Sequence, residues 1–91
     1  MTHKIKILEP YADAIVEGRK NFEVRFNDRG YNAGDFVEFT VISNDGIPFL
    51  THPLNNKTHR ITYVFNGMGI KDEWVVFGLG EVKDDKERSN F

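Results

Sequence analysis

The sequence predicts an α+β fold that is mostly β, a small β-barrel of five to six strands with one short N-terminal helix. Apolar and polar residues alternate with a period of two in several short segments, as is typical of strands. Several of these segments are apolar on both faces, which favours a closed sheet with an interior to fill. The chain has 91 residues, 40% of them hydrophobic, so we expect a single globular domain over residues 1–91.

The first two elements are a strand and a helix. Lysines alternate with isoleucines between His3 and Leu8, which indicates a strand. Pro10 suits the first turn of the helix, where its missing N–H would have no partner. Gly18 suits the end of the helix, because glycine accepts the left-handed conformation. Four apolar residues share one stripe of this helix: Tyr11, Ala12, Ile15 and Val16.

A second strand begins at Asn21, where the period changes to two. Its apolar residues (Phe22, Val24 and Phe26) are expected to hold the strand to the core, and its polar residues (Asn21, Glu23, Arg25 and Asn27) to face the other way. Residues 27–30 and 33–35 are predicted turns. Among the aromatic residues, we expect Phe22, Phe26, Phe39, Phe65 and Phe77 in the core. Trp74 and Tyr63 suit either the core or a cleft in which they stack on a base.

The rest of the chain contains three further strands: Phe36 to Ile42, Ile61 to Phe65 and Trp74 to Leu79. Residues 44–46 form a hairpin signal, with Ile47 to Leu50 as a possible return strand. Thr51 to His59 is expected to be irregular. Residues 82–91 form a charged tail that is expected to fray.

Composition excludes several kinds of site. The chain has no cysteine, which excludes disulfides, thiolate zinc ligands and a cysteine nucleophile. The histidines (His3, His52 and His59) lack metal-binding spacing, and no phosphate-loop or Ser-His-Asp pattern is present, so we expect neither a metal nor a cofactor. Without a signal-peptide pattern or a membrane-length apolar run, the expectation is a cytoplasmic protein with no membrane partner. The net charge of −2 argues against a non-specific nucleic-acid coat but allows a small basic patch.

The charged side of the second strand is the candidate site. Glu23 and Arg25 are two residues apart and therefore share one face. Lys20 reaches the same surface from the helix exit. Arg25 and Arg29 carry forked donors that suit phosphate or carboxylate groups. The alternative is an ordinary solvated sheet face, on which surface ion pairs contribute little.

Four further residues complete the predicted site. Asn27 and Asp28 can cap the turn that aims Arg29. His3 lies near Lys6 on the first strand, where a titrating imidazole would suit a polar site, although a structural or exposed histidine is the alternative.

The motif Gly18-x-Lys20-x-x-Glu23-x-Arg25 is similar to the GxKxxExR motif of the ASCH domain superfamily, which has a PUA-like fold. The chain more specifically resembles the DUF3850 family within that superfamily. The matching residues are His3 and Lys6, the block of Lys20, Phe22 to Arg25 and Asn27 to Arg29, and the turn at Gly34 and Asp35. The segment RITYVFNGMGIKDEWVVFGLGEV is similar to the closing strands of that family.

The resemblance implies a PUA-like barrel with a cleft beside the helix, and RNA or a modified nucleoside as the ligand. Some small ASCH proteins are amidohydrolases on N4-acetylcytidine, and they use the motif lysine, a threonine three residues later and a distant glutamate. Lys20 matches that lysine, but Glu23 stands at the threonine position and removes the hydroxyl nucleophile. Glu38 and Glu73 are candidates for the distant acid.

Three functions therefore remain open. In an RNA- or nucleotide-binding module, Lys6, Lys20, Arg25 and Arg29 would contact phosphates or sugars while Glu23 accepts hydrogen bonds from a base. In an amidohydrolase, Lys20 would act as base or nucleophile and Glu23 as general acid or base. In a protein-interaction domain, the first strand or the loop at 51–59 would carry the contacts.

Overall fold

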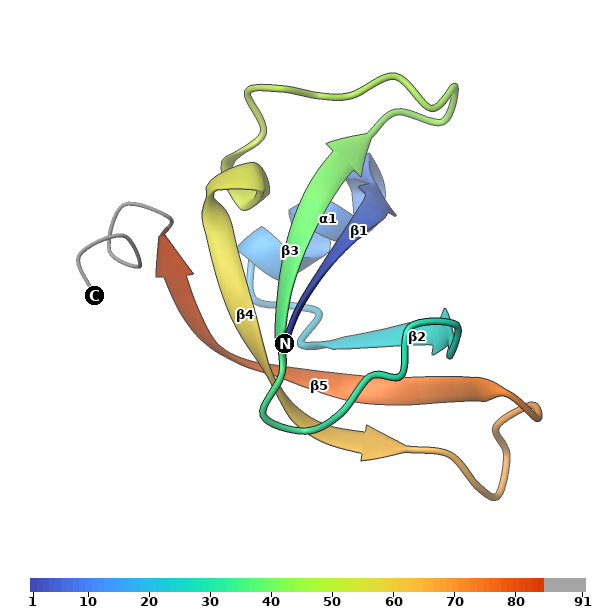
Figure 1. The fold of residues 1–91 in the computed structure, drawn as a ribbon. Helices are drawn as coiled ribbons and strands as arrows, with labels where there is room; N and C mark the ends of the chain where they lie inside the picture. Colours follow the sequence, from blue (N-terminus) through green and yellow to red (C-terminus); the bar gives the residue numbers. More distant parts are fainter. Residues whose placement is uncertain (85–91) are drawn as a thin grey trace.

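The computed structural model describes residues 1–84, with side chains described for residues 1–80 (Figure 1). Its elements are five strands, one α-helix and one 3₁₀ helix: β1 (Thr2–Leu8), α1 (Glu9–Val16), β2 (Phe22–Phe26), β3 (Phe36–Ile42), η1 (Pro53–Asn56), β4 (Lys57–Phe65) and β5 (Trp74–Asp84). The mostly-β fold class with one short N-terminal helix is confirmed. Among the residues described, no helix has the length and apolar character needed to cross a membrane.

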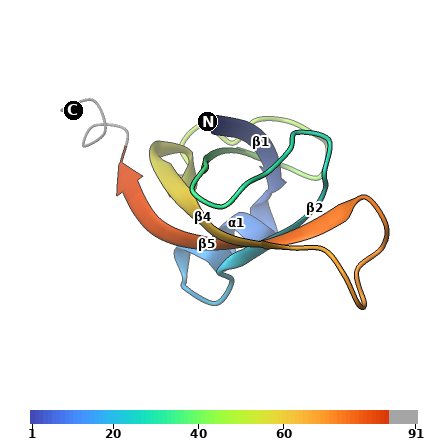
Figure 2. The same cartoon turned by 60° about the horizontal axis from the view of Figure 1, so that its bottom comes forward.

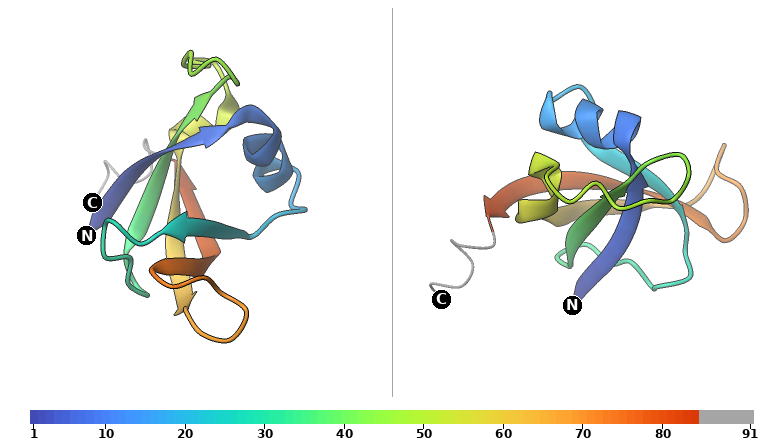
Figure 3. Two further views of the ribbon diagram at one scale, coloured as in Figure 1. Left: turned by 90° about the vertical axis from the view of Figure 1, so that its right-hand side faces the viewer. Right: turned by 90° about the horizontal axis from the view of Figure 1, so that it is seen from above.

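The five strands form one sheet in the order β1-β3-β4-β5-β2. The β1–β3 pair is parallel and the other pairs are antiparallel. The sheet curls into a half-barrel, so that β1 and β2, at opposite ends of the strand order, come to face each other (Figures 2 and 3). The barrel is therefore not closed. The gap between its two edge strands, β1 and β2, is an open seam.

The β4–β5 pair contributes to this curvature. Its register shifts twice, between His59 and Ile61 and again between Ile61 and Val64. Such irregularities bend a strand and increase its twist. Gly78 and Gly80 of β5 leave room for the Thr62 side chain, since a Cβ at either position would lie 2.4 Å from a Thr62 atom. The long strands can thus bend together without a clash.

The core lies on the concave side of the sheet and is built from β1, β3, β4 and β5. Its members are almost completely buried: Ile5, Ile7, Val37, Phe39, Val41, Ile61, Val75 and Phe77, with Ala12, Tyr31 and Leu54 from outside the sheet. Phe39 and Phe77 are in the core, as predicted from the sequence. In α1, Ala12 and Ile15 contact the core, whereas Tyr11 and Val16, predicted on the same stripe, are 54% and 45% exposed.

The orientation predicted for β2 is wrong. Phe22, Val24 and Phe26 do share a face, but that face is outward, and they are 43%, 49% and 46% exposed. The polar side of the strand is turned inward instead, and Glu23 is only 4% exposed. The core assignment of Phe65 is also wrong, since this residue is 41% exposed.

The loop between β3 and β4 differs from the prediction in two ways. The turn at 44–46 forms, but the return strand at Ile47 to Leu50 is reduced to one bridge, between Ile42 and Pro48. Proline has no N–H with which to continue a ladder. The segment expected to be irregular contains η1, capped by the His52 ring, which accepts from the Leu54 amide.

The predicted end of the chain is only partly described. Strand β5 includes residues 82–84, which were expected to belong to the tail. The rest of the predicted tail, residues 85–91, lies outside the described residues.

Candidate ligand-binding pocket

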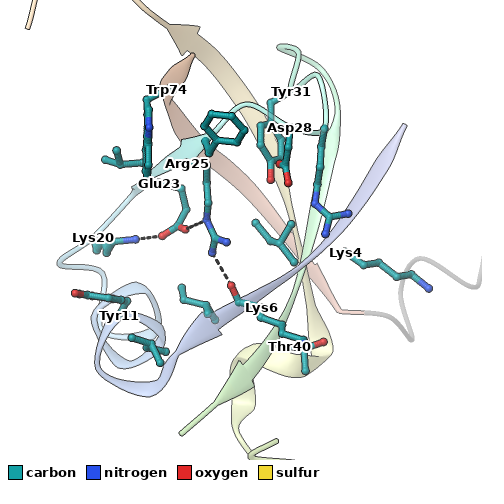
Figure 4. Close-up of a pocket in the computed structure, with 16 residues that line it drawn as sticks. Lys4, Lys6, Tyr11, Lys20, Glu23, Arg25, Asp28, Tyr31, Thr40 and Trp74 are labelled. Carbon is teal, nitrogen blue, oxygen red and sulfur yellow. Dashed lines mark hydrogen bonds and ion pairs between the residues drawn. The ribbon is translucent and has the colours of Figure 1, made fainter. Parts of the chain in front are cut away.

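A pocket of about 960 Å³ lies at the seam between β1 and β2 (Figure 4). It is lined by five consecutive residues of β1 and four of β2, together with side chains from the helix, the loop after β2, β3 and β5. The two edge strands therefore form its walls. This arrangement follows from the curled sheet, which brings strands from opposite ends of the order to one cavity.

The buried carboxylate of Glu23 is held by two cations. Lys20 Nζ donates to Glu23 Oε1, and Arg25 Nε donates to Glu23 Oε2 at 2.8 Å (Figure 4). The side chains of Lys20 and Arg25 are themselves only 16% and 25% exposed. Each carboxylate oxygen is thus already paired with a positive charge.

The chain between α1 and β2 places Lys20 for this contact. Gly18 takes a positive φ of 80°, which ends the helix as the sequence predicts. The amides of Arg19 and Lys20 both donate to the Ala14 carbonyl, at 2.9 and 3.1 Å. The tight exit brings Lys20 back over the first residues of β2, within reach of Glu23 three positions later.

Arg25 joins the two sides of the seam. Its Nη2 donates to the backbone carbonyl of Lys6 at 2.7 Å, so one guanidinium touches both Glu23 and the edge of β1. Among the described residues, no further hydrogen bond engages this guanidinium. Its remaining N–H groups are available to a ligand in the pocket.

The charge of the pocket is opposite to that of the whole protein. Five basic residues line the pocket, together with two acidic ones, and this gives a formal charge of +3: Lys4, Lys6, Lys20, Arg25 and Arg29 with Glu23 and Asp28. The whole chain carries −2. The small basic patch that the net charge allowed therefore lies around this one pocket.

Aromatic residues of α1 and β5 also line the pocket. Trp74 of β5 contacts the ring of Phe26 edge-on, with 6.1 Å between the ring centroids. The ring centroid of Tyr11, on α1, lies 5.7 Å from Lys20 Nζ. Of the two uses open to Trp74, the structure places it in the pocket, whereas Tyr63 is 67% exposed and does not line it.

Tyr31 is a pocket residue that the sequence did not indicate. It is 4% exposed, lines the pocket and packs at a tilt against the rings of His3 and Phe77, with 4.8 Å between the ring centroids in each pair. Burial raises the pKa of the Tyr31 phenol above 10.0, while nearby Arg25 and Arg29 act in the opposite direction. The phenol stays protonated at neutral pH. Tyr31 lies in a loop without periodicity, so no pattern in the sequence marks it.

The structure brings six of the predicted site residues to this pocket: Lys6, Lys20, Glu23, Arg25, Asp28 and Arg29. His3 and Asn27 do not line it. Buried His3 donates through Nε2 to Asp35 Oδ2 at 2.8 Å, and this bond lowers the pKa of the Asp35 carboxyl.

Asn27 and the candidate distant acids lie outside the pocket as well. Asn27 Oδ1 accepts from the Tyr31 amide at 3.0 Å, and so it fixes the loop that positions Tyr31. Neither Glu38 nor Glu73 lines the pocket. Within the described part of the chain, no group of three or more metal-ligating side chains is close enough to hold a metal ion.

A family model described as "Domain of unknown function (DUF3850)" matches residues 2–79. The chain belongs to the DUF3850 family. The matched range includes every pocket residue, from Lys4 to Trp74. A search of curated proteins finds no match. The match confirms the resemblance to DUF3850 that was inferred from the block between Lys20 and Arg29.

Proposed function

We propose that this DUF3850 protein is an RNA- or nucleotide-binding module whose ligand enters the pocket between β1 and β2. The observation that carries the proposal is the buried Glu23 carboxylate, clamped by Lys20 and Arg25 inside a cavity of formal charge +3. Cationic clefts concentrate anionic ligands, and forked guanidinium donors suit phosphate and the acceptor edges of bases.

The burial of the charged face argues against an ordinary solvated sheet face. Such a face would leave Glu23 in water, but this side chain is 4% exposed. Removing an ion pair from water costs several kcal/mol, and apolar residues at such positions are often at least as stable. Charge retained inside a small protein at this cost is typical of a functional site.

Single-stranded RNA or a free nucleotide suits the pocket better than a duplex. A cavity at a barrel seam admits one splayed base, whereas the stacked bases of a duplex cannot enter it. The motif shared with ASCH domains, for which RNA and modified nucleosides are the proposed ligands, supports the same class of ligand. We also propose that the half-barrel is a PUA-like fold, as in ASCH domains.

A binding titration with a matched pair of arginine variants tests the proposal. Fluorescently labelled single-stranded RNA of random sequence is titrated at low salt with the wild type, Arg25→Gln and Arg19→Gln. Both substitutions remove one positive charge, but Arg19 is exposed and pairs with Glu17 outside the pocket. Arg25→Gln is expected to weaken binding at least about tenfold, since a hydrogen bond to a charged group contributes ~1.5–3 kcal/mol.

Equal losses in the two arginine variants would show that binding depends on overall charge and would refute the assignment of the site. A thermal melt of each variant establishes that it is folded. Arg29→Gln, in the loop after β2, gives a second variant that does not disturb the Glu23 clamp.

The contact between Lys20 and Glu23 supports a second candidate, an amidohydrolase acting on a modified nucleoside such as N4-acetylcytidine. Both residues face the pocket, where Lys20 would be base or nucleophile and Glu23 general acid or base. Lys20 donates to Glu23, so its amine must leave this contact to attack a carbonyl. Release of cytidine from N4-acetylcytidine by the wild type but not by Lys20→Ala would establish this activity. Equal, background-level release by both proteins would dismiss it.

A further inference from the structure

We infer that the pocket has two unlike ends and takes a phosphorylated nucleotide, with the base against Trp74 and the phosphate beside Lys6. This inference rests on the proposed function and deepens it. It specifies a nucleotide rather than a nucleoside, and it gives the direction in which the ligand lies.

The first observation is that hydrogen-bond donors dominate the centre of the pocket. Both oxygens of Glu23 are occupied by cations, so this carboxylate mainly positions Lys20 and Arg25. Lys20 and Arg25 each retain N–H groups that the clamp does not use. The central groups therefore suit a ligand rich in acceptors, such as a phosphate or the carbonyl edge of a base.

The second observation is that the lysines of β1 and the ring of Trp74 lie on opposite sides of the pocket. Lys4 and Lys6 belong to β1, at one end of the strand order, and Trp74 belongs to β5, which pairs with β2 at the other end. In Figure 4, Trp74 and Lys6 lie on opposite sides of the Glu23–Arg25 pair. Both groups line one cavity, so the pocket has an aromatic end at Trp74 and a cationic end at Lys6.

Arg25 connects these two ends. Its guanidinium reaches from Glu23 to the Lys6 carbonyl, at 2.8 and 2.7 Å, and in Figure 4 it lies between Trp74 and Lys6. A ligand that uses the whole pocket needs a planar apolar ring, a polar middle and an anionic group. A nucleoside monophosphate has this order of base, sugar and phosphate, whereas a nucleoside or inorganic phosphate would use one end only.

Calorimetric titration of the full chain with three classes of probe tests the inference. The probes are the 5′-monophosphates of adenosine, cytidine, guanosine and uridine, the matching nucleosides, and inorganic phosphate. At least one monophosphate is expected to bind about tenfold more tightly than its nucleoside and than inorganic phosphate, because charge-assisted contacts add to base stacking.

Variants at each end separate the two contributions. Lys6→Gln is expected to remove the advantage of the monophosphate while leaving nucleoside affinity within about twofold. Trp74→Leu is expected to weaken the binding of the nucleoside and of the monophosphate by a similar factor. Lys71→Gln and Tyr63→Leu are matched controls, since both residues are exposed and lie outside the pocket lining.

A nucleoside that binds as tightly as its monophosphate would overturn the inference, and so would inorganic phosphate that binds as tightly as the nucleotide. An equal loss in the Trp74→Leu and Tyr63→Leu variants would overturn the assignment of the aromatic end. Any of these three outcomes is compatible with the proposed function if RNA binding still depends on Arg25. Failure of the proposed function itself has a different signature, in which neither RNA nor any of the probes binds in an Arg25-dependent manner.

Discussion

Acid is expected to destabilise the fold through His59, a buried residue of β4. The ring is 3% exposed, and among the described residues no hydrogen bond reaches its Nδ1. Burial, with a smaller contribution from the charge of Lys57, lowers the pKa of the His59 imidazole from 6.5 to about 4. Between these values the unfolded chain binds a proton that the folded chain does not, so the free energy of unfolding falls as the pH drops from 6.5 toward 4.

The size of the effect follows from the two pKa values. A difference of about 2.5 units at 1.36 kcal/mol per unit gives roughly 3 kcal/mol, of which about 2 kcal/mol falls between pH 7 and 4.5. Urea unfolding at several pH values, on the wild type and on His59→Leu, isolates this contribution. The difference in unfolding free energy between the two proteins is expected to shift by that amount in favour of the variant as the pH falls.

Phe39→Leu provides the control for packing. Phe39 lies against the His59 ring, at 5.7 Å between centroids, but it binds no proton. Its effect on stability is therefore expected to be independent of pH over the same range. A difference between the wild type and His59→Leu that stays constant from pH 7 to 4.5 would refute the reasoning about burial.

Three further predictions follow from single contacts. Glu23→Gln leaves the cations of Lys20 and Arg25 without a countercharge and should lower the unfolding free energy in urea by about 2–3 kcal/mol, whereas an unchanged value would contradict the clamp. Gly78→Ala should lower the unfolding free energy by about 1–3 kcal/mol, because the new Cβ would lie 2.4 Å from Thr62 Oγ1. The same change in a Thr62→Ala background should lower it much less, and equal losses in the two backgrounds would exclude this clash. Asp35→Asn should destabilise the protein at pH 7, and the loss should shrink as the pH falls below about 3.8, because the His3 hydrogen bond holds the Asp35 pKa below that value; a loss independent of pH in acid unfolding would argue against it.

Local patterns in the sequence were sufficient to place most of the elements. The alternation of lysine and isoleucine in β1, the proline near the start of α1 and the glycine after it each correspond to a local preference of the backbone. The failure of the return strand after Ser43 is also local, since the turn forms and Pro48 then interrupts the ladder. These features depend on neighbouring residues and can be inferred from them.

The closure of the sheet and the membership of the pocket are not local properties. Arg25 and the Lys6 carbonyl are 19 residues apart in the chain, and Trp74 is farther still. They meet because the sheet curls, and the curl depends on register shifts in β4 and β5 that no single segment encodes. The motif around Lys20 and Arg25 could therefore indicate where the site begins but not that β1 forms its other wall.

The reversed orientation of β2 is itself evidence for a site. Alternation establishes which side chains share a face, and the hydrophobic effect normally decides which of the two faces is buried. In β2 the usual choice is inverted: Phe22 and Val24 are nearly half exposed while Glu23 is buried. Turning this strand over would bury its apolar face at a gain of ~25 cal/mol per Å² and release the carboxylate to water. A fold that forgoes this gain must compensate elsewhere, and Lys20 and Arg25 provide the compensation inside a pocket where a ligand can reach them. The departure of β2 from the hydrophobic rule therefore favours the pocket over any other surface of the described chain as the place where function resides.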